Sequence, residues 1–490
     1  MPESFRKGLF MRPELHQIML ITYADSMGNN IRALHQLLRT YFCGAVGSVH
    51  LLPFYPSSAD RGFSPLTYET VDGQFGTYGD IRALARDFPL MFDFMVNHIS
   101  RSSAYFLDFQ QNKDYSPYRD LFIRYRDFWE NGEPTREQVD LIYKRKPRAP
   151  SVDVTFADNT TEKIWCTFGE EQIDLNTATP ATRSFFRDNL ELLCKNGASI
   201  IRLDAFAYAV KKPGTSCFFV EPEIWDLLED IRSIVDPFGV SLLPEIHEHY
   251  SIQLKLAEKG YWVYDFALPM LVLYALYAGD GAPLAHWLQI CPRNQFTTLD
   301  THDGIGVVDA ADLLTPEQLE QTQNHLYQHG ANVKRKYSSA AYHNLDIYQI
   351  NCTYYSALGN DDQAYLLARA IQFFAPGVPQ VYYVGLLAGK NDVALMEQTK
   401  QGRDINRHYY TASEVSREVE RPVVQNLLAM MRLRNQCPAF SGDCQVEWSG
   451  PVLVIRRKNG ESRAQLTANL KNHVFEIETN GQRLPLLPMK

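Results

Sequence analysis

Charged side chains stand where several apolar stretches of the sequence end. In residues 198–208, ASIIRLDAFAY, small and β-branched residues lead directly to Arg202 and Asp204. Buried parallel strands are almost continuously apolar, so both side chains must lie at an exposed strand end or in a pocket that uses their charge. Glu245 stands near the end of VSLLPEI in the same way. These three residues are therefore candidates for chemistry.

Two further apolar stretches carry polar side chains at their ends. Asn97 and His98 follow LMFDFMV, which itself contains Asp93, and His302 and Asp303 follow QFTTLD. A single pair of oppositely charged side chains at a strand end more often serves only to neutralise its own charges. Burying so many ionisable groups together costs too much for a purely structural role, so we interpret the set as an active site.

The residue types fit the cleavage of an acetal. This reaction needs one ionised carboxylate to attack the sugar carbon and one protonated carboxyl to release the leaving oxygen. Asp204 fits the first role because the adjacent Arg202 favours its ionised form. Glu245 lies among apolar residues and fits the second, because desolvation raises the pKa of a carboxyl. Other side chains would stabilise charge on the sugar ring or bind its hydroxyls: Asp303, His98 and His302.

Eight short apolar stretches, most of them followed by a helical pattern, predict an α/β protein with a (β/α)8 TIM barrel. The stretches are 17–23, 46–52, 90–96, 199–203, 240–246, 261–266, 295–300 and 378–384. Catalytic groups of such barrels stand at the C-terminal ends of the strands. Two gaps are too long for one crossover helix, and we interpret them as subdomains inserted over that face.

We therefore divide the chain into four parts. The catalytic barrel would comprise residues 1–97, 181–303 and 370–435, with inserted domain B at 98–180. A second inserted domain, B', would span 304–369 and carry a mobile acceptor loop. Alternating apolar residues after about 435 predict a small C-terminal β domain at 436–490.

Composition excludes several classes of function. The formal net charge of −9 over 490 residues argues against nucleic acid or an anionic membrane as partner. The eight cysteines form no CxxC pair, which fits neither a zinc site nor a dense disulfide framework. The first 25 residues carry charges throughout, unlike a signal peptide. We expect a reduced, cytoplasmic protein without a membrane anchor.

Four stretches, DFMVNH, IRLDAFAY, LPEIHEHY and LDTHDG, occur in this order along the chain. They resemble the conserved stretches of the α-amylase superfamily, glycoside hydrolase family 13. The resemblance spans the whole predicted barrel. It implies that Asp204 is the nucleophile, Glu245 the general acid and base, and Asp303 the stabiliser of the transition state.

Further stretches over nearly the full length closely resemble the sucrose phosphorylases of this family, among them HLLPFYPSSADRGFSP, IYKRKPRAP and GRDINRHYY. These are hexosyltransferases that move glucose from sucrose to inorganic phosphate, with retention, through a covalent glucosyl-enzyme. The resemblance places eight residues around the glucosyl ring: Asp60, Phe63, His98, Phe168, Arg202, Tyr208, His302 and Arg403. The loop HNLDIYQIN would supply Leu345, Asp346 and Gln349 to the acceptor, and Tyr348 with Arg145 would bind phosphate.

Phosphate can replace water as the attacking group only where cations offset its repulsion from the carboxylates. YKRKPR at 143–148 is the densest positive run of the chain, although it could also be a solvated surface. Arg145 is our choice within it, because a guanidinium binds phosphate through two hydrogen bonds. The rings of Phe63, Phe168 and Tyr208 are either core residues or a wall beside the sugar carbon.

Other activities stay open at this point. A phosphorylated acceptor needs added cations, and NLDIYQIN contains none, so sucrose 6-phosphate is disfavoured. Glucosylglycerol makes no charge demand and stays open, as do glucosylglycerate and hydrolysis of an α-glucoside. We disfavour a non-enzymatic, amylase-like scaffold, because such a protein would have lost a catalytic carboxylate and gained a membrane anchor.

Many amylases hold a structural calcium near the first insertion, but the resembled phosphorylases generally do without it. We expect no cofactor and no metal. The partners would be small molecules, with neither nucleic acid nor membrane among them, and the resembled group includes both monomers and homodimers.

Overall fold

The computed structural model describes residues 15–146, 148–331 and 349–488. The chain divides into two compact units. Among the described residues, the first contains 51–146 and 148–246, and the second contains 15–50, 247–331 and 349–488.

Eight short, buried strands form one sheet, in the order β10-β11-β14-β1-β2-β3-β8-β9. Each coincides with one of the eight apolar stretches, so the prediction of eight strands is confirmed. Their bounds are β1 (Met19–Thr22), β2 (Ser48–Leu51), β3 (Leu90–Met95), β8 (Ala198–Asp204), β9 (Ser241–Pro244), β10 (Val263–Asp265), β11 (Gln295–Thr297) and β14 (Val378–Tyr382).

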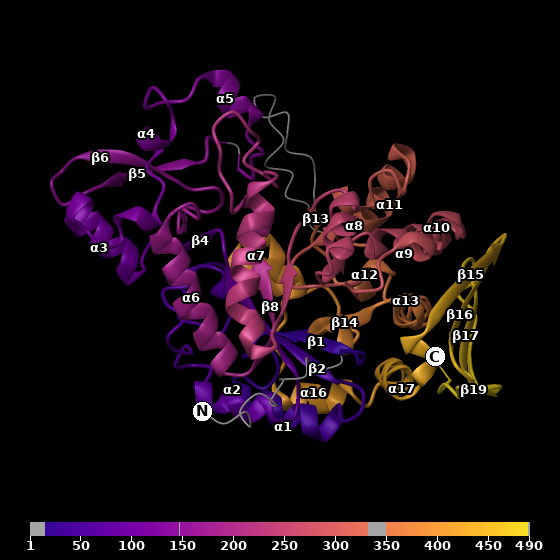
Figure 1. Ribbon diagram of the computed structural model, residues 1–490. Helices are drawn as coiled ribbons and strands as arrows, with labels where there is room; N and C mark the ends of the chain where they lie inside the picture. The colour runs from indigo at the N-terminus through magenta and orange to yellow at the C-terminus, as the bar shows by residue number, and fades with distance from the viewer. Residues whose placement is uncertain (1–14, 147, 332–348, 489–490) are drawn as a thin grey trace, which may run out of the picture. The chain divides into compact units, whose positions relative to one another are not determined.

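In the first unit, β3, β8 and β9 pair in parallel. The register sets Asp93 opposite Arg202 and Met95 opposite Asp204. Figure 1 shows α6 (Pro180–Lys195) and α7 (Glu223–Val235) side by side next to β8. Helix α6 begins with proline at its first position, and the Thr179 side chain accepts a hydrogen bond from the Thr182 amide, so its start is set locally.

Residues 98–174 of the same unit form smaller elements. Strand β4 (His98–Ser100) pairs antiparallel with β7 (Gln172–Asp174), and β5 (Ser151–Thr155) pairs antiparallel with β6 (Thr161–Trp165). The helices of the unit outside the α6–α7 pair are α2 (Tyr78–Ala85), α3 (Ala104–Asn112), α4 (Tyr125–Phe128) and α5 (Arg136–Leu141). Tyr125, Trp129 and Trp165 form the centre of a separate apolar cluster.

In the second unit, β10, β11, β14 and β1 pair in parallel, and β12 (Ile305–Gly306) pairs antiparallel with β13 (Gln349–Ile350). The helices are α1 (Ile31–Tyr41), α8 (Ser251–Glu258), α9 (Leu268–Ala278), α10 (Ala282–Ile290), α11 (Pro316–Gln328), α12 (Tyr354–Ala357), α13 (Asp362–Phe374), α14 (Tyr383–Leu386), α15 (Val393–Thr399), α16 (Ala412–Glu418) and α17 (Pro422–Gln436). The most apolar of them, α9, is buried against α10, α11 and α13. None of the helices in the described ranges has the length and apolar character that a membrane crossing requires.

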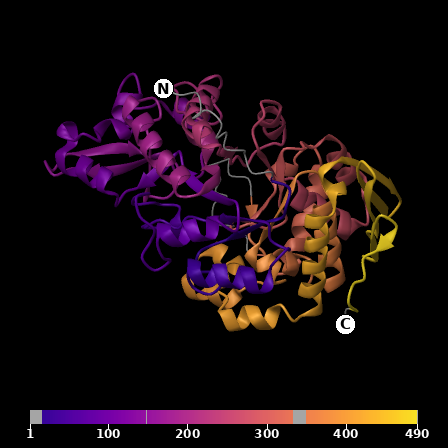
Figure 2. The ribbon, with the colours of Figure 1, turned by 60° about the horizontal axis from the view of Figure 1, so that its bottom comes forward.

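The C-terminal residues form a five-stranded antiparallel sheet, as predicted. Its strands are β15 (Asp443–Ser449), β16 (Val452–Asn459), β17 (Ser462–Asn469), β18 (Phe475–Thr479) and β19 (Gln482–Arg483), paired in that order. Ala464, Leu466 and Ala468 alternate into the core, with the period of two expected for a half-buried strand. In Figure 2 this sheet is yellow and packs on helices of its own unit, including α10 and α13.

Candidate active site

The site in the first unit is organised around the guanidinium of Arg202, which is almost fully buried. Because side chains alternate along a strand, Arg202 and Asp204 project from the same face of β8. Arg202 Nη1 lies 2.8 Å from Asp204 Oδ1 and 2.6 Å from Asp93 Oδ1. Its Nη2 lies 3.6 Å from Glu245 Oε1. One cation therefore serves three carboxylates.

Glu245 is held beside Asp204 by the backbone as well. The amide of Ala205 donates to Glu245 Oε2 at 2.9 Å. To point this amide at Glu245, Ala205 adopts a left-handed conformation with φ 52° and ψ 33°. This region disfavours side chains other than glycine, so local strain directly follows the predicted nucleophile.

Burial and three charged neighbours determine the pKa of Asp204. Burial raises its pKa most, Arg202 lowers it, and the charges of Glu245 and Asp93 raise it further, to a net value of about 8. Arg202 therefore acts in the expected direction, but desolvation and two neighbouring anions raise the pKa of Asp204 by more than one guanidinium lowers it. Because this group is coupled to a neighbour, a proton held here belongs to the interacting carboxyls together.

His98 and Phe63, both predicted to contact the sugar, contact each other. His98 Nε2 donates to the Phe63 carbonyl oxygen at 2.9 Å, and Gln172 Nε2 donates to the same oxygen at 3.1 Å. Burial lowers the pKa of His98, while Asp60 and other charges act on it more weakly. The chain reaches Phe63 through Gly62, where an added Cβ would lie 2.6 Å from the Pro53 carbonyl oxygen, so only glycine fits this turn.

A second group of predicted residues forms an aromatic wall. The ring of Phe168 lies 5.6 Å from that of His98 and 5.1 Å from that of Tyr208. The Arg145 guanidinium lies 5.3 Å from the centre of the Tyr208 ring and 5.4 Å from that of Tyr143. This is a cation–π arrangement, and it brings Arg145 to the residues predicted to surround the sugar.

Arg148, at the end of the same basic run, has a different role. Its guanidinium donates to the carbonyl oxygens of Ala149, Ser151, Cys166 and Phe168 at 2.9–3.1 Å. These bonds join residues 148–151 to residues 166–168. Sequence analysis missed this residue, because a carbonyl partner leaves no mark in the side chains of a sequence.

The side chain of Asn97, at the start of the first insertion, is in contact with a cation. Lys211 Nζ lies 2.5 Å from Asn97 Oδ1 and 2.8 Å from Asp174 Oδ2. Lys211 and Asp174 are both buried. The ammonium uses the oxygens that a metal ion would need, so these residues do not fit a calcium site.

In the second unit, Asp303 lies among cations. Burial raises its pKa, but Arg403 and then His302, His247 and Arg407 lower it, and the net effect is a pKa well below the usual range. Arg403 Nη1 lies 3.1 Å from Asp303 Oδ1, and His302 Nε2 lies 3.9 Å from Asp303 Oδ2. Asp303 is thus permanently ionised, as a stabiliser of positive charge must be.

The second unit also positions residues that sequence analysis missed. The His247 ring stacks on Phe266 with 3.9 Å between ring centres, and its Nδ1 lies 3.4 Å from Asp309 Oδ2. Gln349, predicted to face the acceptor, has its amide nitrogen 3.0 Å from His247 Nε2. The available signal for His247 was its place two residues after Glu245.

The remaining acceptor-loop predictions, Leu345, Asp346 and Tyr348, lie outside the described residues.

Comparisons with known proteins identify the family that the chain resembles. A family model described as the catalytic domain of α-amylase matches residues 44–250. The sucrose phosphorylase of Streptococcus mutans is 55% identical over 96% of this chain and 99% of its own. The glucosylglycerol phosphorylase of Marinobacter adhaerens is 44% identical over 94% and 96%.

A crystal structure of sucrose 6F-phosphate phosphorylase from Thermoanaerobacter thermosaccharolyticum superposes with a TM-score of 0.92, at 42% identity over 96% of this chain and 98% of that one. These matches and the eight-stranded sheet confirm the predicted fold class, an α/β barrel followed by a small β domain.

Proposed function

This chain belongs to the α-amylase family, among its sucrose phosphorylases and their relatives, and from that premise we infer that it transfers glucose from sucrose to inorganic phosphate. The products are α-glucose 1-phosphate and fructose. The observation that carries the proposal is the single buried guanidinium of Arg202 shared by Asp93, Asp204 and Glu245. This arrangement holds Asp204 and Glu245 on one cation, and two neighbouring carboxyl groups are what a double displacement needs.

In the first displacement, Asp204 attacks the anomeric carbon of the glucosyl unit. The bond from this carbon to the fructosyl oxygen breaks, and Glu245 gives its proton to that oxygen. The result is a β-glucosyl ester of Asp204 and free fructose. The raised pKa of Asp204, which is coupled to a neighbouring group, supports a proton shared among these carboxyls before the substrate binds.

In the second displacement, a phosphate oxygen attacks the anomeric carbon and the ester bond to Asp204 breaks. Glu245, now ionised, accepts the proton of the incoming phosphate. Two inversions give net retention at the anomeric carbon. Asp303 and Arg403 would stabilise positive charge on the ring and bind its hydroxyls, with His98, His302, Asp60 and Phe63 completing the sugar pocket.

Arg145 and Tyr348 would hold the phosphate, and Asp346 and Gln349 would contact the acceptor. The position of the Arg145 guanidinium over the Tyr208 ring supports its part of this assignment. Arg145→Ala should raise the apparent KM for phosphate at least tenfold, since a charge-assisted hydrogen bond contributes roughly 1.5–3 kcal/mol. Arg126→Ala, in the same insertion, is the control. An unchanged KM for phosphate in Arg145→Ala would remove this role.

Sucrose is proposed over glucosylglycerol on the closer identity to a sucrose phosphorylase. The test is parallel incubation with phosphate and either sucrose or 2-O-glucosylglycerol, followed by measurement of glucose 1-phosphate. More product from sucrose is expected. More product from glucosylglycerol would overturn the substrate and keep the mechanism, whereas free glucose as the main product would indicate hydrolysis.

We also propose that the chain acts in the cytoplasm, as a monomer or a homodimer, and that its domains divide at 97, 180, 303, 369 and 435.

A further inference from the structure

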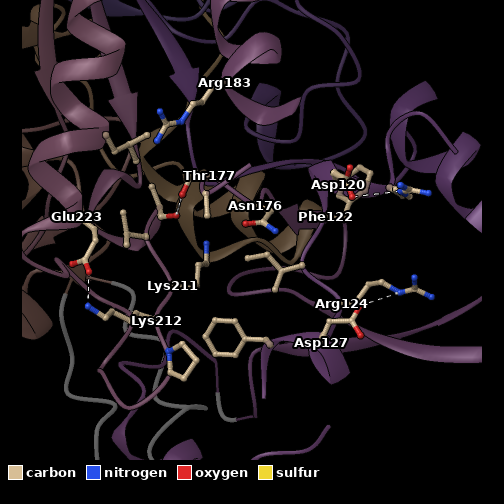
Figure 3. A pocket seen from close by; sticks show the side chains of 18 of the residues that line it. Asp120, Phe122, Arg124, Asp127, Asn176, Thr177, Arg183, Lys211, Lys212 and Glu223 are labelled. Carbon is tan, nitrogen blue, oxygen red and sulfur yellow. Dashed lines mark hydrogen bonds and ion pairs between the residues drawn. The ribbon is translucent and has the colours of Figure 1, made fainter. Parts of the chain in front are cut away.

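The first unit contains a cleft of about 730 Å³ whose described lining includes none of the predicted site residues (Figure 3). Three segments form it: residues 114–128, residues 176–183 at the start of α6, and residues 209–227 between β8 and α7. Its volume falls within the roughly 300–1,000 Å³ of small-molecule sites.

The charges that line this cleft are balanced by pairing. Lys211 pairs with Asp174 at 2.8 Å and Arg183 with Asp230 at 2.9 Å, and three further cations also have a carboxylate partner. Those pairs are Lys212 with Glu223, Arg124 with Asp114, and Arg119 with Asp120. No excess of positive charge is left to attract a phosphate or another anion.

Two polar side chains in the lining keep hydrogen-bonding capacity. Asp226 projects from α7, is exposed, and has no ion pair with any residue that the structure describes. The side-chain amide of Asn176, which Figure 3 places inside the cleft, likewise has no hydrogen-bond partner among the described residues. A carboxylate accepts and an amide both donates and accepts, which suits a ligand with several hydroxyl groups.

Apart from Asp127 and Thr177, which have partners of their own, the rest of the lining is apolar. Phe128, half-buried against Trp129 and Trp165, presents an aromatic edge, and Val210 and Leu227 add aliphatic surface. A sugar ring has apolar C–H faces and a polar rim of hydroxyls, and the cleft offers surfaces of both kinds. Ligand pockets typically combine apolar walls with a few polar groups in this way.

We propose that this cleft binds a neutral sugar of mono- or disaccharide size, at a site separate from the one that transfers glucose. The proposal does not depend on the assigned reaction, because no residue of the glucosyl site contributes to the cleft.

The test is equilibrium dialysis of labelled sucrose against the full chain carrying Asp204→Asn, which stops turnover. Two sites per chain are expected. Adding Asp226→Ala should weaken one of them at least tenfold, since a hydrogen bond to a charged group is lost. Adding Ala178→Trp, which fills the cleft from its rim, should abolish the same site. Glu229→Ala, on the same helix but outside the lining, should leave both unchanged.

The outcomes separate this proposal from the assigned function. A single site that Asp226→Ala and Ala178→Trp both leave intact would overturn the cleft site. A single site that both variants weaken would support it, even if the assigned donor were wrong. Displacement of the cleft-bound sucrose by inorganic phosphate, but not by fructose, would overturn the neutral-sugar assignment.

Discussion

Two buried arginines, one in each unit, contact different numbers of carboxylates. Arg202 is shared by Asp93, Asp204 and Glu245. Arg369 meets a single carboxylate, and its Nη2 lies 2.8 Å from both oxygens of Asp300. Its other nitrogens donate to Tyr365 Oη at 2.9 Å and Gln372 Oε1 at 2.8 Å. One carboxylate thus balances the charge of Arg369, and neutral groups accept its other hydrogen bonds.

The difference extends to the backbone beside each arginine. An added Cβ on Gly385 would lie 2.1 Å from both Arg369 Nη2 and Asp300 Oδ2, so the pair is enclosed too tightly for any side chain there. Beside Arg202 the reverse holds, because Ala205 has a side chain where the conformation favours glycine. A one-to-one, enclosed pair serves the fold. Three carboxylates on one cation, with a strained backbone next to them, fit the proposed reaction instead.

The largest expected effect comes from Asp204→Asn. Without the nucleophile, kcat for phosphorolysis should fall by about 10⁴-fold or more. The variant should nevertheless be no less stable at pH 8. A carboxyl whose pKa is raised by folding contributes stability that is complete below its unfolded pKa and is lost as pH rises through about 8. The side-chain amide of the variant does not ionise, so this loss of stability is absent. Denaturant unfolding at pH 5 and pH 8 measures the difference in the free energy of unfolding.

Asp300→Asn should show the opposite pattern. Removing one partner of a buried pair leaves an uncompensated charge, which costs about 3–5 kcal/mol. The denaturation midpoint should fall sharply, while kcat per folded molecule should stay close to the wild-type value. Loss of kcat without loss of stability would contradict the division between the two arginines.

The pH dependence of activity should next distinguish the carboxyls around Arg202 from Asp300 beside Arg369. The pKa of about 8 for Asp204 sets the upper limit of the pH range in which the site retains its proton. Above it, kcat/KM for sucrose should fall tenfold per pH unit, because fructose departure requires that proton. Measured at saturating phosphate, kcat/KM for sucrose excludes the ionisation of phosphate itself. A plateau extending beyond pH 9.5 would contradict the assignment.

Most of the sheet could be predicted from the sequence, because buried strands leave continuous apolar stretches of strand length. The stretch at 198–208 gave β8 together with Arg202 and Asp204 at its end. What a single strand cannot reveal is its neighbour. Asp93 meets Arg202 through the register of β3 and β8, and this register depends on packing rather than on local pattern.

The residue types of the candidate site could be predicted from the sequence better than the pKa values of its groups. The expectation for Asp204 considered Arg202 alone, whereas desolvation, Glu245 and Asp93 also act on its pKa. Arg148 and Arg145 are equally basic in the sequence, yet one donates to carbonyls and the other lies over Tyr208. Much of this difference comes from residues distant in the sequence, Cys166 and Phe168 for Arg148 and Tyr208 for Arg145.

Arg148 extends the comparison to an arginine whose recorded partners are four carbonyl oxygens and the Cys166 sulfur, with no carboxylate among them. Arg148→Lys should reduce kcat/KM for sucrose by about tenfold, because small displacements of a positioning group are costly, here through Phe168. The KM for phosphate should stay unchanged. Arg145→Ala should give the reverse pattern, with phosphate affected and kcat/KM for sucrose preserved. Equal effects of Arg148→Lys on both substrates would indicate general loosening instead of positioning.

The smallest expected effect is that of Ala205→Gly. Glycine relieves a left-handed conformation that costs about 1–2 kcal/mol, but it adds unfolded-state entropy of about 0.5–1 kcal/mol. Stability should therefore rise by about 1 kcal/mol or less. The freed backbone would hold its amide less firmly toward Glu245, so kcat/KM for sucrose should fall a few-fold. Ala388→Gly, at a left-handed alanine of the second unit with φ 46°, is the matched control. It should give the same gain in stability without the loss of kcat/KM, and a loss in both variants would separate the strain at Ala205 from the chemistry at Asp204.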